Sequence, residues 1–222
     1  MHSTCAEPAP RLPCYPARRS RAGLLLVVEG PHDIEFLRRI SRMLHRHHSA
    51  LPDLAHFDDT GRLVFIPVGG GRLAMWTRRF ASLGLPEVHL YDRESPPETA
   101  LREQVVADIN RRPGCLGLLT TRRSLEHYLH PATVTEVFGL EVPIGDDQPL
   151  ADLLARRLYE RYARAVPWDE LPRPVQSKRR NRVKHRLHTK CVDRMTPQRL
   201  GESDPDGEVT GWLAEIRRLL DR

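Results

Sequence analysis

Aromatic residues, paired cysteines and long apolar runs are scarce in this chain of 222 residues. Phe, Trp and Tyr make up only 6% of it, so we expect a core built from Leu, Val and Ile. The four cysteines, Cys5, Cys14, Cys115 and Cys191, form no C-x-x-C pair, which argues against a zinc site or a disulfide framework and favours free thiols. No apolar run approaches the roughly 18 residues that span a membrane, and no signal-peptide pattern is visible, so we expect a cytoplasmic protein.

Positively charged residues outnumber negatively charged ones in the sequence. Lys and Arg number 35 against 29 Asp and Glu, which gives a formal net charge of +6 and a pI near 9.5. A basic protein of this size often meets a polyanion, although its charge says nothing about its fold. Residues 1–21 are rich in proline and arginine and poor in aliphatic side chains, which predicts a disordered leader.

From residue 22 onward, short apolar runs alternate with amphipathic segments. The predicted strands are "LLLVV" (24–28), "RLVFIPV" (62–68), "EVHLYDRE" (87–94) and "CLGLLTT" (115–121). The predicted helices between them cover residues 31–48, 72–84 and 96–112. Alternating strands and helices of this kind predict an α/β fold with a parallel sheet and right-handed crossovers.

Beyond residue 121 the pattern becomes helical. We expect a catalytic α/β domain over residues 22–130 and a helical extension over residues 131–222. The last helix of the extension places its apolar residues on one stripe, so it should pack on the body of the protein: Val209, Trp212, Leu213, Ile216, Leu219 and Leu220.

Acidic residues follow two of the predicted strands. Glu29 ends the first strand, with Asp33 one helical turn further, and Asp92 and Glu94 end the third strand. Strand alternation would put Asp92 and Glu94 on the same side of the sheet. Sites in open parallel sheets form beyond the carboxyl ends of the strands, so we expect these four carboxylates around one crevice.

Carboxylates gathered in one crevice repel each other unless a cation is present. Hard oxygen ligands in this arrangement suit Mg²⁺ or Mn²⁺. Two such ions can activate water and stabilise a leaving oxygen during phosphodiester cleavage. The acids therefore predict a metal site for phosphate chemistry.

The motifs "VVEGPHD" (27–33), "VGGG" (68–71) and "LYDRE" (90–94) together resemble a TOPRIM domain. That parallel, Rossmann-like fold is shared by topoisomerases, bacterial primases, small ribosomal RNA maturases, recombination mediators and OLD-family (overcoming lysogenization defect) nucleases. Its hallmarks are Glu-Gly after the first strand and Asp-x-Asp after the third. This chain departs from the second hallmark, because Glu94 stands in place of the second aspartate.

Three features are most similar to the TOPRIM part of OLD-family nucleases. They are Asp33, the segment "TRRSLEHYLHP" (121–131) with Glu126, and a downstream lysine in "VKHRLHTKC" (183–191). The resemblance implies metal ligands at Glu29, Asp33, Asp92, Glu94 and Glu126. It also implies catalytic roles for Glu29 and Asp92, and for Lys190 as the cation that stabilises the transition state, with Lys184 as the alternative.

A basic segment lies within the extension, over residues 173–190, where no acid interrupts the basic residues. Phosphate contacts by such a segment supply sequence-independent, salt-sensitive affinity for nucleic acid. The expected nucleic-acid-binding residues are Arg173, Lys178, Arg179, Arg180, Arg182, Lys184 and Arg186.

The leading hypothesis is a Mg²⁺- or Mn²⁺-dependent endonuclease that cuts or nicks DNA within an anti-phage defence module. OLD-family proteins usually carry an ABC-type ATPase, but this chain has no G-x-x-x-x-G-K-[ST] loop, so a separate ATPase chain is an expected partner. Two alternatives stay open: an RNase that acts on structured RNA such as tRNA or ribosomal RNA, and a non-catalytic TOPRIM partner of an ABC-type ATPase.

Overall fold

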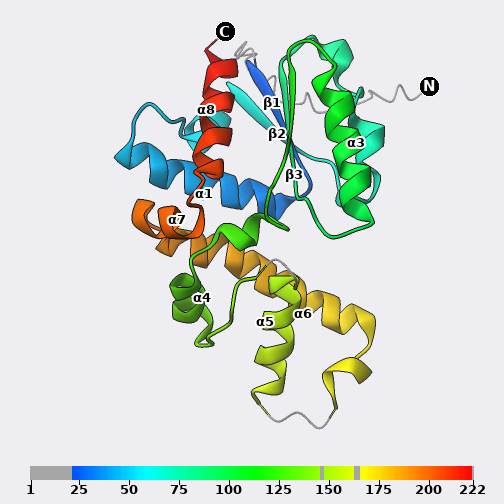
Figure 1. Cartoon of the computed structure of the whole chain (residues 1–222), viewed down its shortest axis with the longest axis vertical. Helices are drawn as coiled ribbons and strands as arrows, with labels where there is room; N and C mark the ends of the chain where they lie inside the picture. Colours follow the sequence, from blue (N-terminus) through cyan, green and yellow to red (C-terminus); the bar gives the residue numbers. More distant parts are fainter. Residues whose placement is uncertain (1–21, 146–147, 163–165, 222) are drawn as a thin grey trace, which may run out of the picture.

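The computed structural model describes residues 22–145, 148–162 and 166–221; the predicted leader, residues 1–21, lies outside them. Four parallel strands form one sheet, flanked by helices and followed by a helical part (Figure 1). The strand order is β2-β1-β3-β4, with β1 at Leu24–Val28, β2 at Leu63–Pro67, β3 at Glu87–Tyr91 and β4 at Cys115–Leu119. The predicted α/β fold with a C-terminal helical extension is confirmed.

Strands β1 and β3 are neighbours at the centre of the sheet. Leu25 pairs with Glu87 and Val27 pairs with His89 in parallel register. Parallel neighbours end at the same edge of a sheet. The residues that follow β1 and β3 therefore meet at one place.

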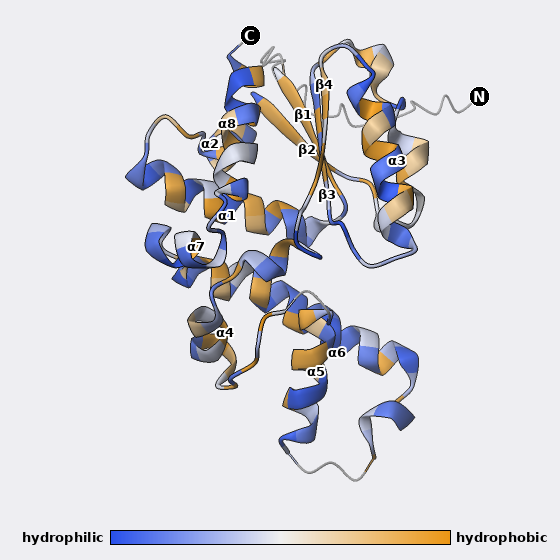
Figure 2. Ribbon diagram, viewed as in Figure 1, coloured by the Kyte–Doolittle hydropathy of each residue, from blue (hydrophilic) through white to orange (hydrophobic). Residues whose placement is uncertain are grey.

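Helices cover both faces of the sheet (Figure 1). Helices α1 (Pro31–His47) and α8 (Glu208–Leu220) lie on one face, and α3 (Glu98–Asn110) lies on the other. Strand β1 is hydrophobic throughout (Figure 2), β3 alternates Glu87 and His89 with apolar residues, and every residue of both strands is buried. A sheet covered on both faces needs such continuous apolar strands, as the sequence indicated.

The last helix packs as predicted. Its whole apolar stripe is buried: Val209, Trp212, Leu213, Ile216, Leu219 and Leu220. The ring of Trp212 meets that of Tyr128 edge-on, with centroids 5.2 Å apart. One continuous core thus joins the strands to the C-terminal helix, and packing does not stop at residue 130.

One predicted helix is wrong. Residues 72–84 form no α-helix; instead, two 3₁₀ segments, η1 (Gly70–Trp76) and η2 (Ala81–Leu83), carry the chain to β3. The glycines at the start fit this outcome, because a Cβ on Gly70 would come within 2.7 Å of a Glu29 carboxylate oxygen. The backbone here approaches the end of β1 closely, which a side chain would prevent.

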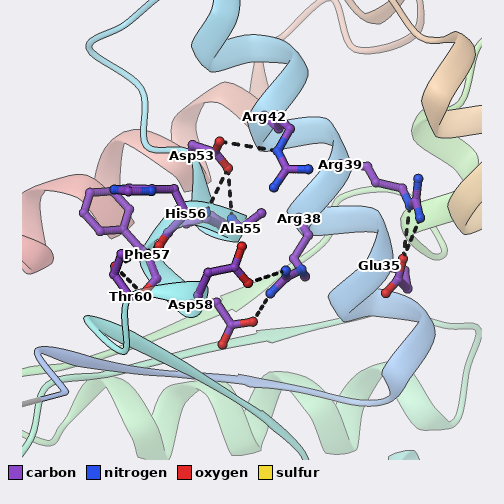
Figure 3. Close-up of polar contacts among 12 residues, drawn as sticks. Glu35, Arg38, Arg39, Arg42, Asp53, Ala55, His56, Phe57, Asp58 and Thr60 are labelled. Atoms are coloured by element: carbon purple, nitrogen blue, oxygen red, sulfur yellow. Dashed lines mark hydrogen bonds and ion pairs between the residues drawn. The ribbon is translucent and has the colours of Figure 1, made fainter. Parts of the chain in front are cut away.

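A short helix that was not predicted, α2 (Leu54–Asp59), lies between α1 and β2, and the Asp53 side chain caps its N-terminus. Ion pairs tie α2 to α1 (Figure 3): Arg38 binds Asp58 and Asp59, and Arg42 contacts Asp53 at 3.4 Å. Each pair lies at the surface, where ion pairs contribute roughly 0–1 kcal/mol. Each of these three aspartates is thus paired with an arginine.

The helical part follows β4. Its elements are η3 (Leu125–Tyr128), α4 (Pro131–Phe138), α5 (Leu150–Glu160), η4 (Trp168–Glu170), α6 (Arg173–Arg186), η5 (Leu187–Cys191), η6 (Val192–Arg194) and α7 (Pro197–Ser203). Helices α5 and α6 pack against each other at the end of the molecule away from the sheet (Figure 1). No helix in the described part of the chain is long and apolar enough to cross a membrane.

Candidate functional site

The first acid of the site, Asp33, lies in the opening turn of α1 and is only 4% exposed. Pro31 begins the helix, and the backbone N–H of Gly30 donates to Asp33 Oδ2 at 2.8 Å. The other oxygen, Oδ1, is buried and has no hydrogen-bond partner. A buried, unsatisfied carboxylate oxygen is costly unless a further group binds it.

Asp92 and Glu126 complete a group of three buried carboxylates. Asp92 follows β3 directly and is 5% exposed, and its Oδ1 accepts the backbone N–H of Leu125 at 3.0 Å. That bond fixes the start of η3, on which Glu126 lies, also 5% exposed. Asp33, Asp92 and Glu126 are called the acid cluster below.

His188 supports the acid cluster from the helical part. Its ring is fully buried, with Nε2 3.2 Å from a Glu126 carboxylate oxygen and Nδ1 2.8 Å from the carbonyl oxygen of His32. The two ring nitrogens thus tie the helical part to both α1 and η3. His188 lies in η5, a π-helical turn of the kind often found at functional sites.

Lys184 supplies a positive charge at the acid cluster. Burial alone would lower its pKa, but the carboxylates of Glu126, Asp33, Asp92 and Glu29 outweigh this and raise it. The lysine is therefore a permanent positive charge beside the acid cluster. Six residues further on, Lys190 is exposed to solvent. The structure thus brings the alternative lysine, Lys184, to the acids rather than Lys190.

The three carboxylates have unequal pKa values. Burial, and then the charges of Asp33, Glu29 and Glu126, raise the pKa of Asp92 well above its ordinary value. Burial also raises the pKa of Asp33, although Lys184 and His188 oppose it. Burial would raise the pKa of Glu126 as well, but the hydrogen bond from His188 and the charge of Lys184 hold it well below its ordinary value. Unequal pKa values among close carboxylates are typical of functional sites.

Glu29 lies at the rim of the acid cluster and is bound by an arginine. Arg102, a buried residue of α3, binds both carboxylate oxygens of Glu29 and donates to the carbonyl oxygen of Asp92 at 2.7 Å. The backbone N–H of Asp92 also donates to Glu29, at 3.0 Å. Glu29 and Asp92 are therefore adjacent, as predicted, but Glu29 already has a cation.

Glu94 does not share the environment of Asp92. Its φ of 57° is the only positive value among the described residues other than glycine. Strand geometry ends at Tyr91, so the alternation that would have aligned Glu94 with Asp92 does not continue. Its carboxylate lies instead 3.5 Å from Nε of Arg123, and its backbone N–H donates to the Arg123 carbonyl oxygen at 2.8 Å.

The basic segment separates into side chains with different partners. Arg180 pairs with Asp152 at 3.1 Å, Arg179 lies over the ring of Tyr159, and Arg186 lies over that of Phe138. Lys178 and Arg182 line a groove beside α6, and Arg173 does not.

Two residues of the site, Arg102 and His188, were not found from the sequence. Arg102 had a weak signal, because it shares a helical face with the buried Val105 and Ile109, where an arginine needs a partner. His188 had none, because a π-helical turn shifts residues out of the α-helical phase on which face assignments depend.

The site's fit to a divalent cation rests on its donors. No group of three or more His, Cys, Asp or Glu side chains within residues 22–145, 148–162 and 166–221 is arranged to hold a metal ion. The donor chemistry nevertheless fits a small hard cation: Asp33 Oδ1 is buried without a hydrogen bond, with only His188 Nδ1 at 3.9 Å, and Asp92 is crowded by negative charge. A cation among these oxygens would relieve both features.

No protein-family model, curated protein or solved structure matches this chain.

Proposed function

We propose that this protein is a metal-dependent nuclease that cuts or nicks DNA, acting in an anti-phage defence module. The observation that carries the proposal is the acid cluster: three buried carboxylates from three segments of the chain meet beside Lys184. The resemblance of "VVEGPHD" and "LYDRE" to TOPRIM motifs supports the same chemistry.

In this proposal Asp33, Asp92 and Glu126 would hold Mg²⁺ or Mn²⁺, with Glu29 at the rim, whereas Glu94 lies against Arg123 instead. A bound divalent cation supplies Lewis-acid charge and an activated water for phosphodiester hydrolysis. His188 holds the Glu126 carboxylate through its 3.2 Å contact. Arg102 fixes Glu29 against the end of β3, so the rim keeps its shape.

Lys184 would stabilise the negative charge that develops on the phosphate in the transition state. A preorganised cation in a site that excludes water is worth more than one in solvent. The carboxylates around Lys184 keep it protonated. Lys190 is exposed and lacks that setting.

A cleavage assay tests the proposal. Supercoiled plasmid and total RNA are incubated with wild-type protein in Mg²⁺ or Mn²⁺, and with Glu126→Gln, Lys184→Met and Lys190→Met. We expect Lys184→Met to slow cleavage by about 10²–10³-fold, because one transition-state contact is lost. Glu126→Gln should abolish it, and Lys190→Met should leave it near the wild-type rate.

The matched lysine variants decide between two assignments. A large loss in Lys190→Met with none in Lys184→Met would return the catalytic role to Lys190. Wild-type cleavage by Glu126→Gln would overturn the nuclease proposal. The RNA arm tests the alternative substrate, structured RNA.

A non-catalytic role as the partner of an ABC-type ATPase is the second candidate. The pairing of Glu29 with Arg102 favours it, because that carboxylate is already neutralised. Isothermal titration with Mn²⁺ separates the two. Saturable binding that is lost in Asp33→Asn supports the nuclease, and no binding by folded wild-type protein supports the scaffold.

A further inference from the structure

A groove of about 840 Å³ runs beside α6 and ends at His32. Its α6 wall includes Ser177, Lys178, Asn181, Arg182 and His185, which recur three and four residues apart. Residues so spaced share one helical face. The carbonyl oxygen of His32 lies 2.8 Å from His188 Nδ1, and Nε2 of the same ring lies 3.2 Å from Glu126, so this part of the groove lining is next to the acid cluster.

We infer that this groove binds one strand of nucleic acid and leads its backbone toward the acid cluster. The inference rests on the proposed function and names its substrate class: a single strand, or a duplex end opened to one. Figure 2 shows α6 as largely hydrophilic, as such a surface requires.

Charge is the first argument. Lys178 and Arg182 have no hydrogen bond or ion pair to any side chain in the part of the chain that the structure describes. Their neighbours on α6 are engaged: Arg180 by Asp152, and Arg186 by the carbonyl oxygen of Val137 at 2.5 Å. Of the three cations that line the groove, Arg186 is thus engaged, and Lys178 and Arg182 are left for a ligand.

The spacing of these cations fits a strand. Four residues of α-helix rise about 6 Å, which is comparable with the step between successive phosphates along one strand. Lys178 and Arg182 have that separation, and His185 continues the row toward His32. A row of single donors on one helix face matches one backbone, whereas a duplex presents two.

Two aromatic rings stand at the inner end of the groove. The imidazoles of His32 and His185 lie 5.8 Å apart between centroids, at an interplanar angle of 56°. Neither ring has a hydrogen bond to another residue in the described ranges. Unstacked bases of single strands bind rings of this kind, including histidine, next to a basic groove.

Access to the acids gives the fourth argument. Asp33, Asp92 and Glu126 are each at most 5% exposed, so a phosphate has to enter a recess to reach them. The opposite face of α6 is occupied, because Val183 is buried and Arg179 lies on Tyr159. A flexible single backbone can bend into such a recess more readily than a stiff duplex.

The test is binding without cleavage. Fluorescence anisotropy in EDTA measures the affinity of a labelled single-stranded DNA, its RNA equivalent and the DNA duplex over a series of salt concentrations. The groove variant is Lys178→Gln/Arg182→Gln. The control is Arg156→Gln/Arg157→Gln, which removes the same charge from the neighbouring helix α5, outside the groove.

We expect wild-type protein to prefer single strands over the duplex. The groove variant should bind single strands about tenfold more weakly, and its log–log salt slope should shrink by about 1.4, or 0.7 per lost phosphate contact. The control should keep the wild-type slope. His185→Ala should weaken binding about fivefold with an unchanged slope, because stacking releases no counterions.

Groove-dependent binding of either the DNA or the RNA strand supports the inference, and the two arms tell which sugar is preferred. Equal losses in the two double variants, a duplex preference, or tighter binding of poly-glutamate would each overturn it. Because the assay needs neither metal nor cleavage, its failure is distinct from failure of the nuclease proposal.

Discussion

Strand β3 has a buried acid near each end, and the two acids have opposite surroundings. Glu87, at the start, is fully buried and faces cations and donors: Arg112 binds both its oxygens, and His89 Nε2 lies 2.8 Å away. Asp92, just past the other end, is 5% exposed and faces other carboxylates. Burial would raise the pKa of Glu87, yet Arg112 and His89 lower it; burial and charge together raise the pKa of Asp92.

The difference separates an acid whose partners are all within the fold from one that would gain from a bound cation. The polar chain at the start of β3 is complete: Glu87 accepts from His89, and His89 Nδ1 accepts from the Tyr91 hydroxyl at 2.8 Å. Nothing there is left for a ligand to satisfy. At the other end, negative charges crowd Asp92, and Asp33 Oδ1 is buried without a hydrogen bond, as expected of a site that binds a cation.

The largest expected effect comes from neutralising Asp92. Asp92→Asn keeps the oxygen that accepts the Leu125 N–H but removes one charge from the cluster. We expect cleavage to fall by at least about 10²-fold, with the free energy of unfolding in EDTA higher by roughly 1 kcal/mol, because repulsion is relieved. Plasmid cleavage and urea unfolding measure the two changes.

A matched control comes from an acid that has its own arginine. Asp58→Asn removes a similar charge from the pairs of Figure 3. It should leave cleavage unchanged and lower stability by at most about 1 kcal/mol. If Asp92→Asn is less stable than Asp58→Asn, the interpretation that repulsion destabilises the acid cluster is wrong.

Removing the cation at the start of β3 should have the next largest effect. Arg112→Met leaves the Glu87 carboxylate buried without its partner. We expect a loss of about 3 kcal/mol in the free energy of unfolding, because an unpaired buried charge is strongly destabilising. Cleavage per folded molecule should be retained, since this end of the strand lies away from the acid cluster.

The double variant Glu87→Met/Arg112→Met sharpens this result. Replacing both partners by apolar groups avoids the unpaired charge, so it should recover part of the lost stability. An Arg112→Met protein with wild-type stability but no cleavage would reverse the roles assigned to the two ends.

The sequence predicted the end of the sheet at which the candidate site lies, because the apolar run of residues 24–28 stops at Glu29 and the third predicted strand ends in Asp92 and Glu94. The parallel fold then brings Glu29 and Asp92 together. The apolar stripe of the C-terminal helix, from Val209 to Leu220, could also be predicted, since residues on one face of a regular helix recur with a fixed period.

The features that could not be predicted from the sequence depend on irregular backbone and on tertiary contacts. Period-two alternation fails at Glu94 because φ turns positive there. The choice between Lys184 and Lys190 depends on which face of α6 meets the sheet, and a π-helical turn follows Lys184. The helix expected over residues 72–84 was lost to the close approach of Gly70 to Glu29.

The smallest expected effect is a pH dependence at the start of β3. Arg112 and His89 hold the pKa of Glu87 in the folded protein below its ordinary value. The ionised Glu87 side chain therefore stabilises the fold fully at a pH above the ordinary pKa of glutamate. This contribution is lost as the pH falls through the lower pKa of the folded protein. Burial lowers the pKa of His89, so acidification below about 6.5 protonates the unfolded chain first and also favours unfolding. In thermal unfolding experiments in EDTA, Glu87→Gln should therefore be less stable than the wild-type protein. The difference in stability should be largest near neutral pH and smaller in acid. The difference in stability could instead stay constant down to the ordinary pKa of glutamate and below. That result would mean that the charge of Glu87 does not stabilise this end of the strand.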